Sequence, residues 1–69
     1  MSYNEISSLP SLRLLKIKEV QLRCAISRAS VYRLISEGKF PRQVRLSSRA
    51  IGFYEHEVNE WIESRHRAE

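Results

Sequence analysis

The segment Ser27–Gly38 constrains the fold of this chain most strongly, because it has the pattern of a short helix with both ends marked. Ser27 is of a type that accepts a hydrogen bond from the free amides of a first helical turn, and Gly38 is of a type that ends helices. The apolar residues between them recur at helical spacing, and the opposite face is small, polar and positive. We therefore expect an amphipathic helix over 27–37.

Beyond this helix the hydrophobic period changes from that of a helix to that of a strand. The segments Val44–Leu46 and Ile51–Tyr54 alternate between apolar and other side chains, with Leu46 among the residues expected on the inner face. The polar connection Ser47–Ala50 separates them and carries Arg49. This pattern predicts a β-hairpin with one buried face and a basic loop tip.

A further helix is expected on the N-terminal side of this segment, over 18–25, after an apolar stretch at 12–17 that can form a short strand or a docking segment. The residues Ala25–Ser27 form the turn between the two helices. Two short helices joined by about three residues form a helix-turn-helix motif, whose second helix reads the major groove of DNA.

The C-terminal part of the chain predicts one more helix, over 55–66. Trp61 is expected to be its main core anchor, since burial of an indole ring contributes more than that of any other side chain here. The basic residues Arg65–Arg67 are expected in its last turn, where they suit the helix dipole. The expected fold is mainly α with a small β-hairpin: one winged helix-turn-helix domain over 12–69, preceded by a flexible arm at 1–11.

The charges are distributed unevenly along the 69 residues, whose net charge is +4. Residues 24–54 hold six basic side chains and one acidic one, a net charge of +5, whereas residues 55–69 hold five Glu and two Arg, a net charge of −3. Charge runs are often only solvated surface. Six positive residues on a helix and the hairpin after it favour nucleic acid as the partner. The outer face of the helix, with Ser30 and Arg33, suits the major groove, and Arg49 suits a narrow minor groove.

Other chemistry finds little support in the sequence. The chain has one cysteine and two histidines without metal-ligand spacing, so no metal or other cofactor is expected, and Cys24 is expected to be a packing residue. No catalytic set and no phosphate-binding glycine loop is present, so we expect no enzymatic activity. Without an apolar run of membrane-spanning length or a signal-peptide pattern, a cytoplasmic protein is expected.

Several motifs in register resemble one known family. They are Arg13–Val20, Ile26–Pro41, Val44–Leu46, Ile51–Phe53 and Glu57–Ile62. In this order they are similar to the AlpA-type prophage regulators, small winged-helix proteins related to phage excisionases and to the DNA-binding domain of MerR-type regulators. The resemblance extends over roughly residues 13–65.

The resemblance implies a sequence-specific transcriptional regulator of a phage, prophage or other mobile element that binds double-stranded DNA. It implies a recognition helix at 27–37 in the major groove and a wing at 45–51 at the minor groove or backbone. By position, the expected DNA contacts are Ser27, Arg28, Ser30, Tyr32, Arg33, Lys39, Arg42, Arg45, Ser48 and Arg49. Lys39 and Arg42 are expected to meet phosphate.

Two other functions remain open at this point. One is an excisionase-like architectural factor that binds tandem sites and bends DNA. The other is a protein-interaction module that uses the outer face of the last helix, with an integrase or an RNA polymerase subunit as partner. Because nearly all large apolar residues are needed inside, we expect a monomer or a weak dimer that assembles on DNA.

The chain departs from the family pattern at two places. The family usually has Thr-Gly where this chain has Cys24 and Ala25, and it often has Ser or Thr where this chain has Ala29. If the backbone at Ala25 is left-handed, the residue is strained by roughly 1 kcal/mol relative to glycine. The methyl group of Ala29 can pack on a thymine methyl group.

Overall fold

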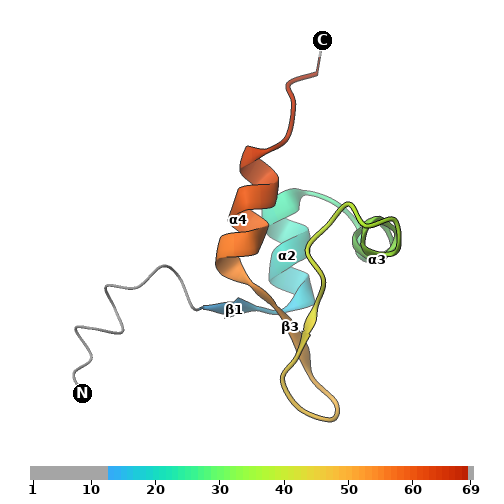
Figure 1. Ribbon diagram of the computed structural model, residues 1–69, viewed down its shortest axis with the longest axis vertical. Coiled ribbons are helices and arrows are strands. Elements are labelled where there is room, and N and C mark those ends of the chain that lie inside the picture. The colour runs from blue at the N-terminus through green and yellow to red at the C-terminus, as the bar shows by residue number, and fades with distance from the viewer. Residues whose placement is uncertain (1–12, 69) are drawn as a thin grey trace, which may run out of the picture.

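A computed structural model describes residues 13–68, so the arm expected at 1–11 lies outside the described residues. Their elements, in chain order, are β1 (Leu14–Leu15), α2 (Ile17–Cys24), α3 (Arg28–Ser36), β2 (Val44–Arg45), β3 (Ile51–Tyr54) and α4 (Glu55–Glu63). In Figure 1, α2 packs behind α4, α3 is seen end-on to one side, and the loop between β2 and β3 extends away from the helices. The predicted fold class, mainly helical with a helix-turn-helix and a small hairpin, is confirmed.

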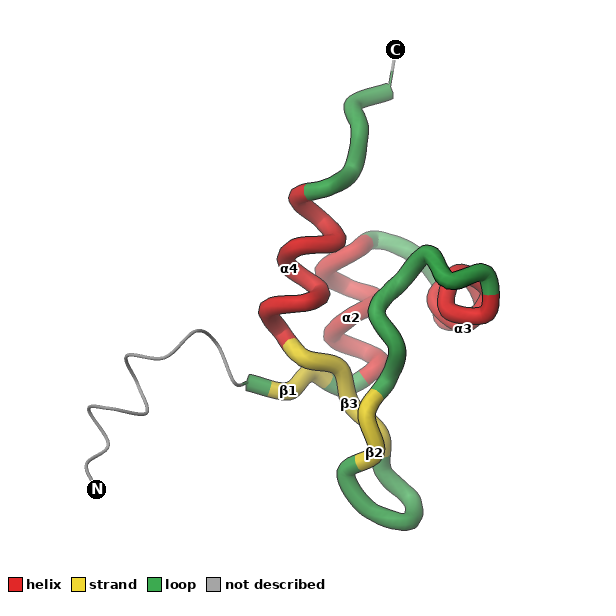
Figure 2. The backbone as a smooth tube through the Cα atoms, viewed as in Figure 1, coloured by secondary structure: helices red, strands yellow, loops and turns green. Residues whose placement is uncertain are grey.

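The strands form a three-stranded antiparallel sheet in which β3 is central, with the order β1-β3-β2. Leu15 pairs with Phe53 on one side of β3, and Val44 pairs with Gly52 on the other. The short apolar stretch before α2 is therefore a strand. Figure 2 shows the three strands meeting beneath α2 and α4, so the sheet fixes the base of the hairpin against the helices.

The core takes buried side chains from all the elements except β2. Each of the five elements β1, α2, α3, β3 and α4 contributes one, and the connection between α3 and β2 contributes another: Leu15, Val20, Val31, Phe53, Val58 and Phe40. Phe40 and Phe53 meet edge to face, with 6.1 Å between ring centroids. The orientation of α3 relative to the hairpin therefore rests on the same core as the sheet.

The expected alternation in the hairpin is wrong in one respect. Gly52, expected outside, is buried, and Leu46, expected inside, is 42% exposed. The reason is that Leu46 folds over Gly52: a Cβ atom at Gly52 would lie 3.1 Å from Leu46 Cδ1 and 3.3 Å from the Leu15 carbonyl oxygen. The absence of a side chain at Gly52 thus lets β1 and Leu46 approach the central strand closely.

The turn between α2 and α3 has a left-handed residue at Ala25, where the resembling family usually has glycine. The helix begins at Ile17 and ends at Cys24, one residue earlier at each end than expected, and Ala25 adopts φ 59° and ψ 39°. The Ala25 amide donates to the Gln21 carbonyl, and the left-handed conformation turns the Ile26 amide toward the same carbonyl at 3.3 Å, which closes the helix end. Ile26 then packs against the core, as expected for the apolar residue of this turn.

We expect Ala25→Gly to raise the free energy of unfolding by roughly 0.5–1 kcal/mol, because glycine adopts a left-handed backbone without the steric cost borne by a Cβ atom. Denaturant unfolding measures this directly. The matched control is Ala29→Gly, which places the same change inside α3 and is expected to lower stability. Equal destabilisation by both variants would contradict the strain at Ala25.

Helix α4 is shorter than predicted. It ends at Glu63, and the basic residues Arg65–Arg67 follow it rather than forming its last turn. The Ser64 hydroxyl and the Arg65 Nε–H donate to the carbonyl oxygen of Trp61 at 2.7 and 3.1 Å, so side chains satisfy the acceptor that a longer helix would use. Trp61 packs against the core but is only half-buried, so the expectation that it is the main core anchor is wrong.

Candidate nucleic-acid interface

The start of α3 is held by a side-chain cap. The Ser27 hydroxyl oxygen accepts a hydrogen bond from the Ser30 amide at 3.1 Å, as the sequence predicts. The same hydroxyl donates to Ser30 Oγ at 3.0 Å. The cap therefore engages Ser27, and the hydroxyl proton of Ser30 remains available for an acceptor outside the protein.

The end of α3 fixes the direction in which the chain leaves the helix. Gly38 has φ 73°, its amide donates to the Ile35 carbonyl, and the Lys39 amide donates to the Leu34 carbonyl at 2.8 Å. This pair of bonds is the Schellman motif, which needs a left-handed residue at the position of Gly38. The motif places Lys39 directly after the last turn of α3.

The outward face of α3 is open. Ala29, Arg33 and Ser36 are exposed. The Ser36 hydroxyl donates to the main-chain carbonyl of Arg33 at 2.7 Å, so this bond does not involve the Arg33 guanidinium. The Arg28 guanidinium lies 5.8 Å from the ring centroid of Tyr32, a cation–π arrangement that aligns both side chains along the first turns. This face presents donors without bulky groups around them.

The loop between β2 and β3 is a compact turn with an exposed basic tip. The Leu46 amide donates to the Ala50 carbonyl at 2.8 Å, and the Ser47 hydroxyl accepts from the Arg49 amide at 3.3 Å. Arg45 reaches along the loop toward the Ser48 carbonyl at 3.4 Å. Arg49 has no such contact within residues 13–68, so its guanidinium is directed to solvent.

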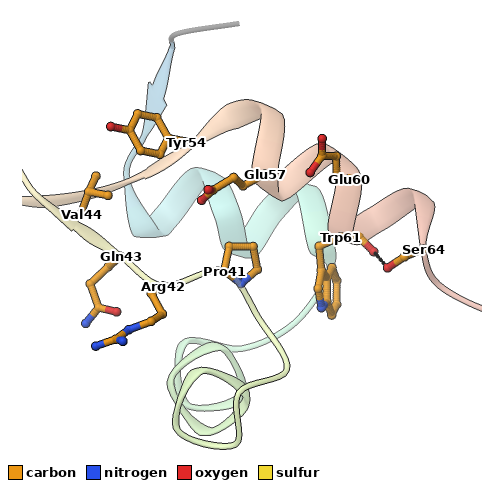
Figure 3. Close-up of a pocket in the computed structure, with 9 residues that line it drawn as sticks. All are labelled: Pro41, Arg42, Gln43, Val44, Tyr54, Glu57, Glu60, Trp61 and Ser64. Carbon is orange, nitrogen blue, oxygen red and sulfur yellow. Dashed lines mark hydrogen bonds between the residues drawn. The ribbon is translucent and has the colours of Figure 1, made fainter. Parts of the chain in front are cut away.

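An open groove separates this surface from α4 (Figure 3). Pro41–Val44 forms one wall, and Tyr54, Glu57, Glu60, Trp61 and Ser64 form the other. Figure 3 shows the Arg42 side chain extending away from α4, while Glu57 and Glu60 come from α4 itself. Arg42 and these two carboxylates line the same groove, and among residues 13–68 no ion pair joins Arg42 to either of them.

The basic residues predicted to contact DNA lie along α3, the connection after it and the hairpin. We call this set the basic strip: Arg28, Arg33, Lys39, Arg42, Arg45 and Arg49. All six side chains are exposed. Among residues 13–68, the one ion pair in the strip joins Lys39 and Glu37 at 3.7 Å, with both groups exposed to solvent. The strip therefore presents positive charge that the protein itself does not neutralise.

Two arginines outside the strip, Arg13 and Arg23, are paired with carboxylates. Arg23 contacts Glu55 at 2.9 Å and Glu19 at 3.1 Å, and Arg13 lies within 3.8 Å of the same two carboxylates. The hydrogen bond that Arg23 donates to Glu55 is the largest factor that raises the pKa of Arg23. These four residues form a network that ties the residue before β1 to α2 and α4. The charges of Arg13 and Arg23 are thus neutralised by carboxylates of the protein, whereas those of the basic strip are not. This difference favours binding of an external anion at the strip.

The sequence does not reveal how the strip is anchored to α4. Trp61 Nε1–H donates to the Lys39 carbonyl at 2.8 Å, and the indole ring meets Phe40 edge to face, with 4.9 Å between centroids. The partners are 22 residues apart along the chain, so no local pattern signals the bond. The bond holds the backbone of the connection that carries Lys39.

The remaining reactive groups point to structural roles. Burial raises the pKa of the Cys24 thiol, which keeps it protonated and suits the predicted packing role. Among residues 13–68 no cluster of three His, Cys, Asp or Glu side chains is arranged to hold a metal ion. In the same part of the chain, no helix has the length and apolar character needed to cross a membrane.

Comparisons with known proteins agree with this arrangement. Residues 13–66 match the family described as prophage CP4-57 regulatory protein (AlpA). The chain is also 38% identical over 53 residues to the uncharacterized protein ORF88 of Enterobacteria phage P4, a match that covers 77% of this chain and 60% of that protein. No solved structure matches the chain. Because the family match includes both helices of the helix-turn-helix, the hairpin and α4, this chain belongs to the AlpA family of prophage regulatory proteins.

Proposed function

We propose that this chain is a sequence-specific DNA-binding transcriptional regulator of a phage or prophage, and that it binds DNA without catalysing a reaction. The observation that carries the proposal is the basic strip, whose six exposed side chains hold a single solvent-exposed ion pair among residues 13–68. Unneutralised charge along a helix and the hairpin beside it is the electrostatic footprint of a DNA-binding surface.

In the proposed complex α3 lies in the major groove. Arg33 projects from its exposed face and can donate two hydrogen bonds to a guanine edge. Ser30 donates its free hydroxyl proton to a base acceptor, and Ala29 offers a methyl group to thymine. Arg28 and the Tyr32 hydroxyl lie on the side of the helix where they meet a base edge or the adjoining phosphates.

The rest of the strip is proposed to position the helix. Lys39 and Arg42 contact phosphates beside the groove, and Arg45, Ser48 and Arg49 place the hairpin loop on the neighbouring minor groove or backbone. Phosphate contacts fix the register of a protein on the duplex without reading its sequence. An arginine at the loop tip is attracted to a narrow minor groove by its strong negative potential.

We expect Lys39→Ala to weaken binding to all duplexes alike and to reduce the slope of log K against log salt by about 0.9, because one phosphate contact is lost. Its ion pair with Glu37 is exposed and contributes little to stability, so the fold is expected to persist. The measurement is a titration of duplex DNA at several salt concentrations. Lys18→Ala, an exposed lysine on α2 outside the strip, is the matched control. An unchanged slope in the Lys39 variant would remove it from the interface.

The same titrations test the proposed function as a whole. Binding to duplex DNA at low salt with a marked salt dependence is expected, and absence of binding would contradict the proposal and favour a protein partner for the strip. Footprinting on the bound DNA then separates two modes of action. A single operator is expected for a promoter regulator, whereas adjacent repeated sites with bent DNA would show an architectural factor of the excisionase kind.

A further inference from the structure

Arg65, which follows α4, is held in place by three contacts. Its guanidinium carbon lies 4.1 Å from the ring centroid of Trp61, its Nε–H donates to the Trp61 carbonyl at 3.1 Å, and its Nη2 donates to Ser64 Oγ at 3.2 Å. The side chain remains exposed, and no carboxylate within residues 13–68 forms an ion pair with it. Arg65 therefore presents a fixed positive charge to solvent, in a part of the chain that is otherwise acidic.

The contacts of Trp61 place Arg65 beside the basic strip. One side of the indole carries the Arg65 guanidinium, and its Nε1–H is bonded to the Lys39 carbonyl at 2.8 Å. The positive charge of Arg65 also reaches the end of α2, where it acts against the larger effect of burial, which raises the pKa of the Cys24 thiol. Arg65 is thus close to both the residues that precede α3 and those that follow it.

The segment that follows α4, residues 64–68, and the hairpin loop lie on different sides of α3. In the view of Figure 1 the hairpin loop lies below the level of α3, and residues 64–68 lie above it. The basic strip covers α3 and the side toward the hairpin. In that view the segment after α4 thus lies on the side of α3 opposite to the hairpin loop.

We infer that Arg65, stacked on Trp61, is a further phosphate-binding residue, which contacts the DNA backbone on the side of α3 away from the hairpin loop. This inference rests on the proposed function, since it assumes that α3 is placed on DNA. The duplex is then held on both sides of the recognition helix, by Arg49 at one end and Arg65 at the other. Holding a helix from two sides fixes its tilt in the groove better than one side does.

The test compares Arg65→Gln with the unaltered chain in salt titrations on duplex DNA. The variant keeps a long polar side chain but loses the charge. We expect weaker binding on all sequences and a salt slope smaller by about 0.9. Between 50 and 200 mM salt, the advantage of the unaltered chain over the variant is expected to shrink roughly 3.5-fold. Lys18→Gln is the matched control, because it removes one exposed positive charge on α2, outside this surface.

Two further variants separate a DNA contact from a purely structural role. Arg65→Lys keeps the charge and is expected to retain the salt slope while losing the planar stacking on Trp61. Trp61→Phe keeps an aromatic ring but cannot donate to the Lys39 carbonyl. It is expected to weaken DNA binding while changing the slope of log K against log salt by less than the loss of one phosphate contact would. Circular dichroism confirms that each variant is folded before titration.

The outcomes distinguish this inference from the proposed function. If the unaltered chain binds DNA and Arg65→Gln has the same salt slope and affinity as the control Lys18→Gln, Arg65 is not a phosphate contact, and the proposed function stands. If the unaltered chain binds no DNA at low salt, the proposed function fails and the inference with it. A slope that falls in Arg65→Gln and recovers in Arg65→Lys supports the contact.

Discussion

Arg33→Ala is expected to lower DNA affinity by about 1–3 kcal/mol on the preferred site and to relax discrimination at one base pair. Arg33 lies on the exposed face of α3, and within residues 13–68 its guanidinium has no ion-pair partner. A side chain in that position is free to form the bidentate contact with guanine that discriminates most strongly in the major groove. Competition titrations with every single-base variant of the preferred duplex measure the loss at each position.

The matched variant for this prediction is Arg33→Lys, which keeps the positive charge but loses the planar fork of donors. If Arg33 reads a base, the lysine variant retains the salt slope and loses discrimination at the same base pair as the alanine variant. An equal loss of affinity on all sequences would instead show that Arg33 only meets phosphate.

Phe53→Ala is expected to have the largest effect on the fold, a loss of about 3–5 kcal/mol in the free energy of unfolding. Phe53 is fully buried in the central strand, pairs with Leu15 of β1 and meets Phe40 edge to face. A domain of this size is stable by only about 3–10 kcal/mol, so the variant is expected to lose a large part of its stability. Denaturant unfolding monitored by the fluorescence of Trp61, the chain's one tryptophan, measures the change.

The control for this prediction is Leu22→Ala, a large-to-small change at a residue that is 81% exposed. Its expected effect is within about 0.5 kcal/mol. If the two variants unfolded at the same denaturant concentration, the side chain of Phe53 would not belong to the core. DNA binding by a folded Phe53 variant would also show that the hairpin does not depend on this contact.

Local sequence signals predict most of the fold. The caps at Ser27 and Gly38 define α3 because side-chain capping and a left-handed glycine act over a few residues. The change of period beyond Gly38 predicts the hairpin for the same reason. The left-handed conformation at Ala25 is suggested by the resembling family, which usually has glycine at this position.

The features that the sequence does not predict depend on contacts between distant segments. Gly52 is buried because Leu46 folds over it and the Leu15 carbonyl of β1 lies against it, and the second of these contacts joins segments that are far apart in the chain. At the early end of α4, the side chains of Ser64 and Arg65 donate to the Trp61 carbonyl oxygen, which a backbone amide would use in a longer helix. The anchoring of Lys39 by Trp61 has no local signal.

For the candidate interface, the sequence predicts the residue types and their clustering. The structure adds that the charges of the basic strip are exposed and that the arginines of β1 and α2 are neutralised by Glu19 and Glu55. Pairing of this kind joins residues up to 42 positions apart and cannot be inferred from charge counts. Six exposed positive side chains along α3, the connection after it and the hairpin identify one face of the domain as the candidate DNA surface.

The central claim is that α3 reads a DNA sequence, and a selection from random duplexes at moderate salt tests it most directly. The protein is mixed with a pool of randomised DNA, and the bound fraction is sequenced over several rounds. We predict a defined motif, with a strongly preferred guanine whose preference disappears in the Arg33→Ala variant. Binding without enrichment of any motif would contradict sequence-specific recognition, and no retention of DNA at all would contradict DNA binding by this surface.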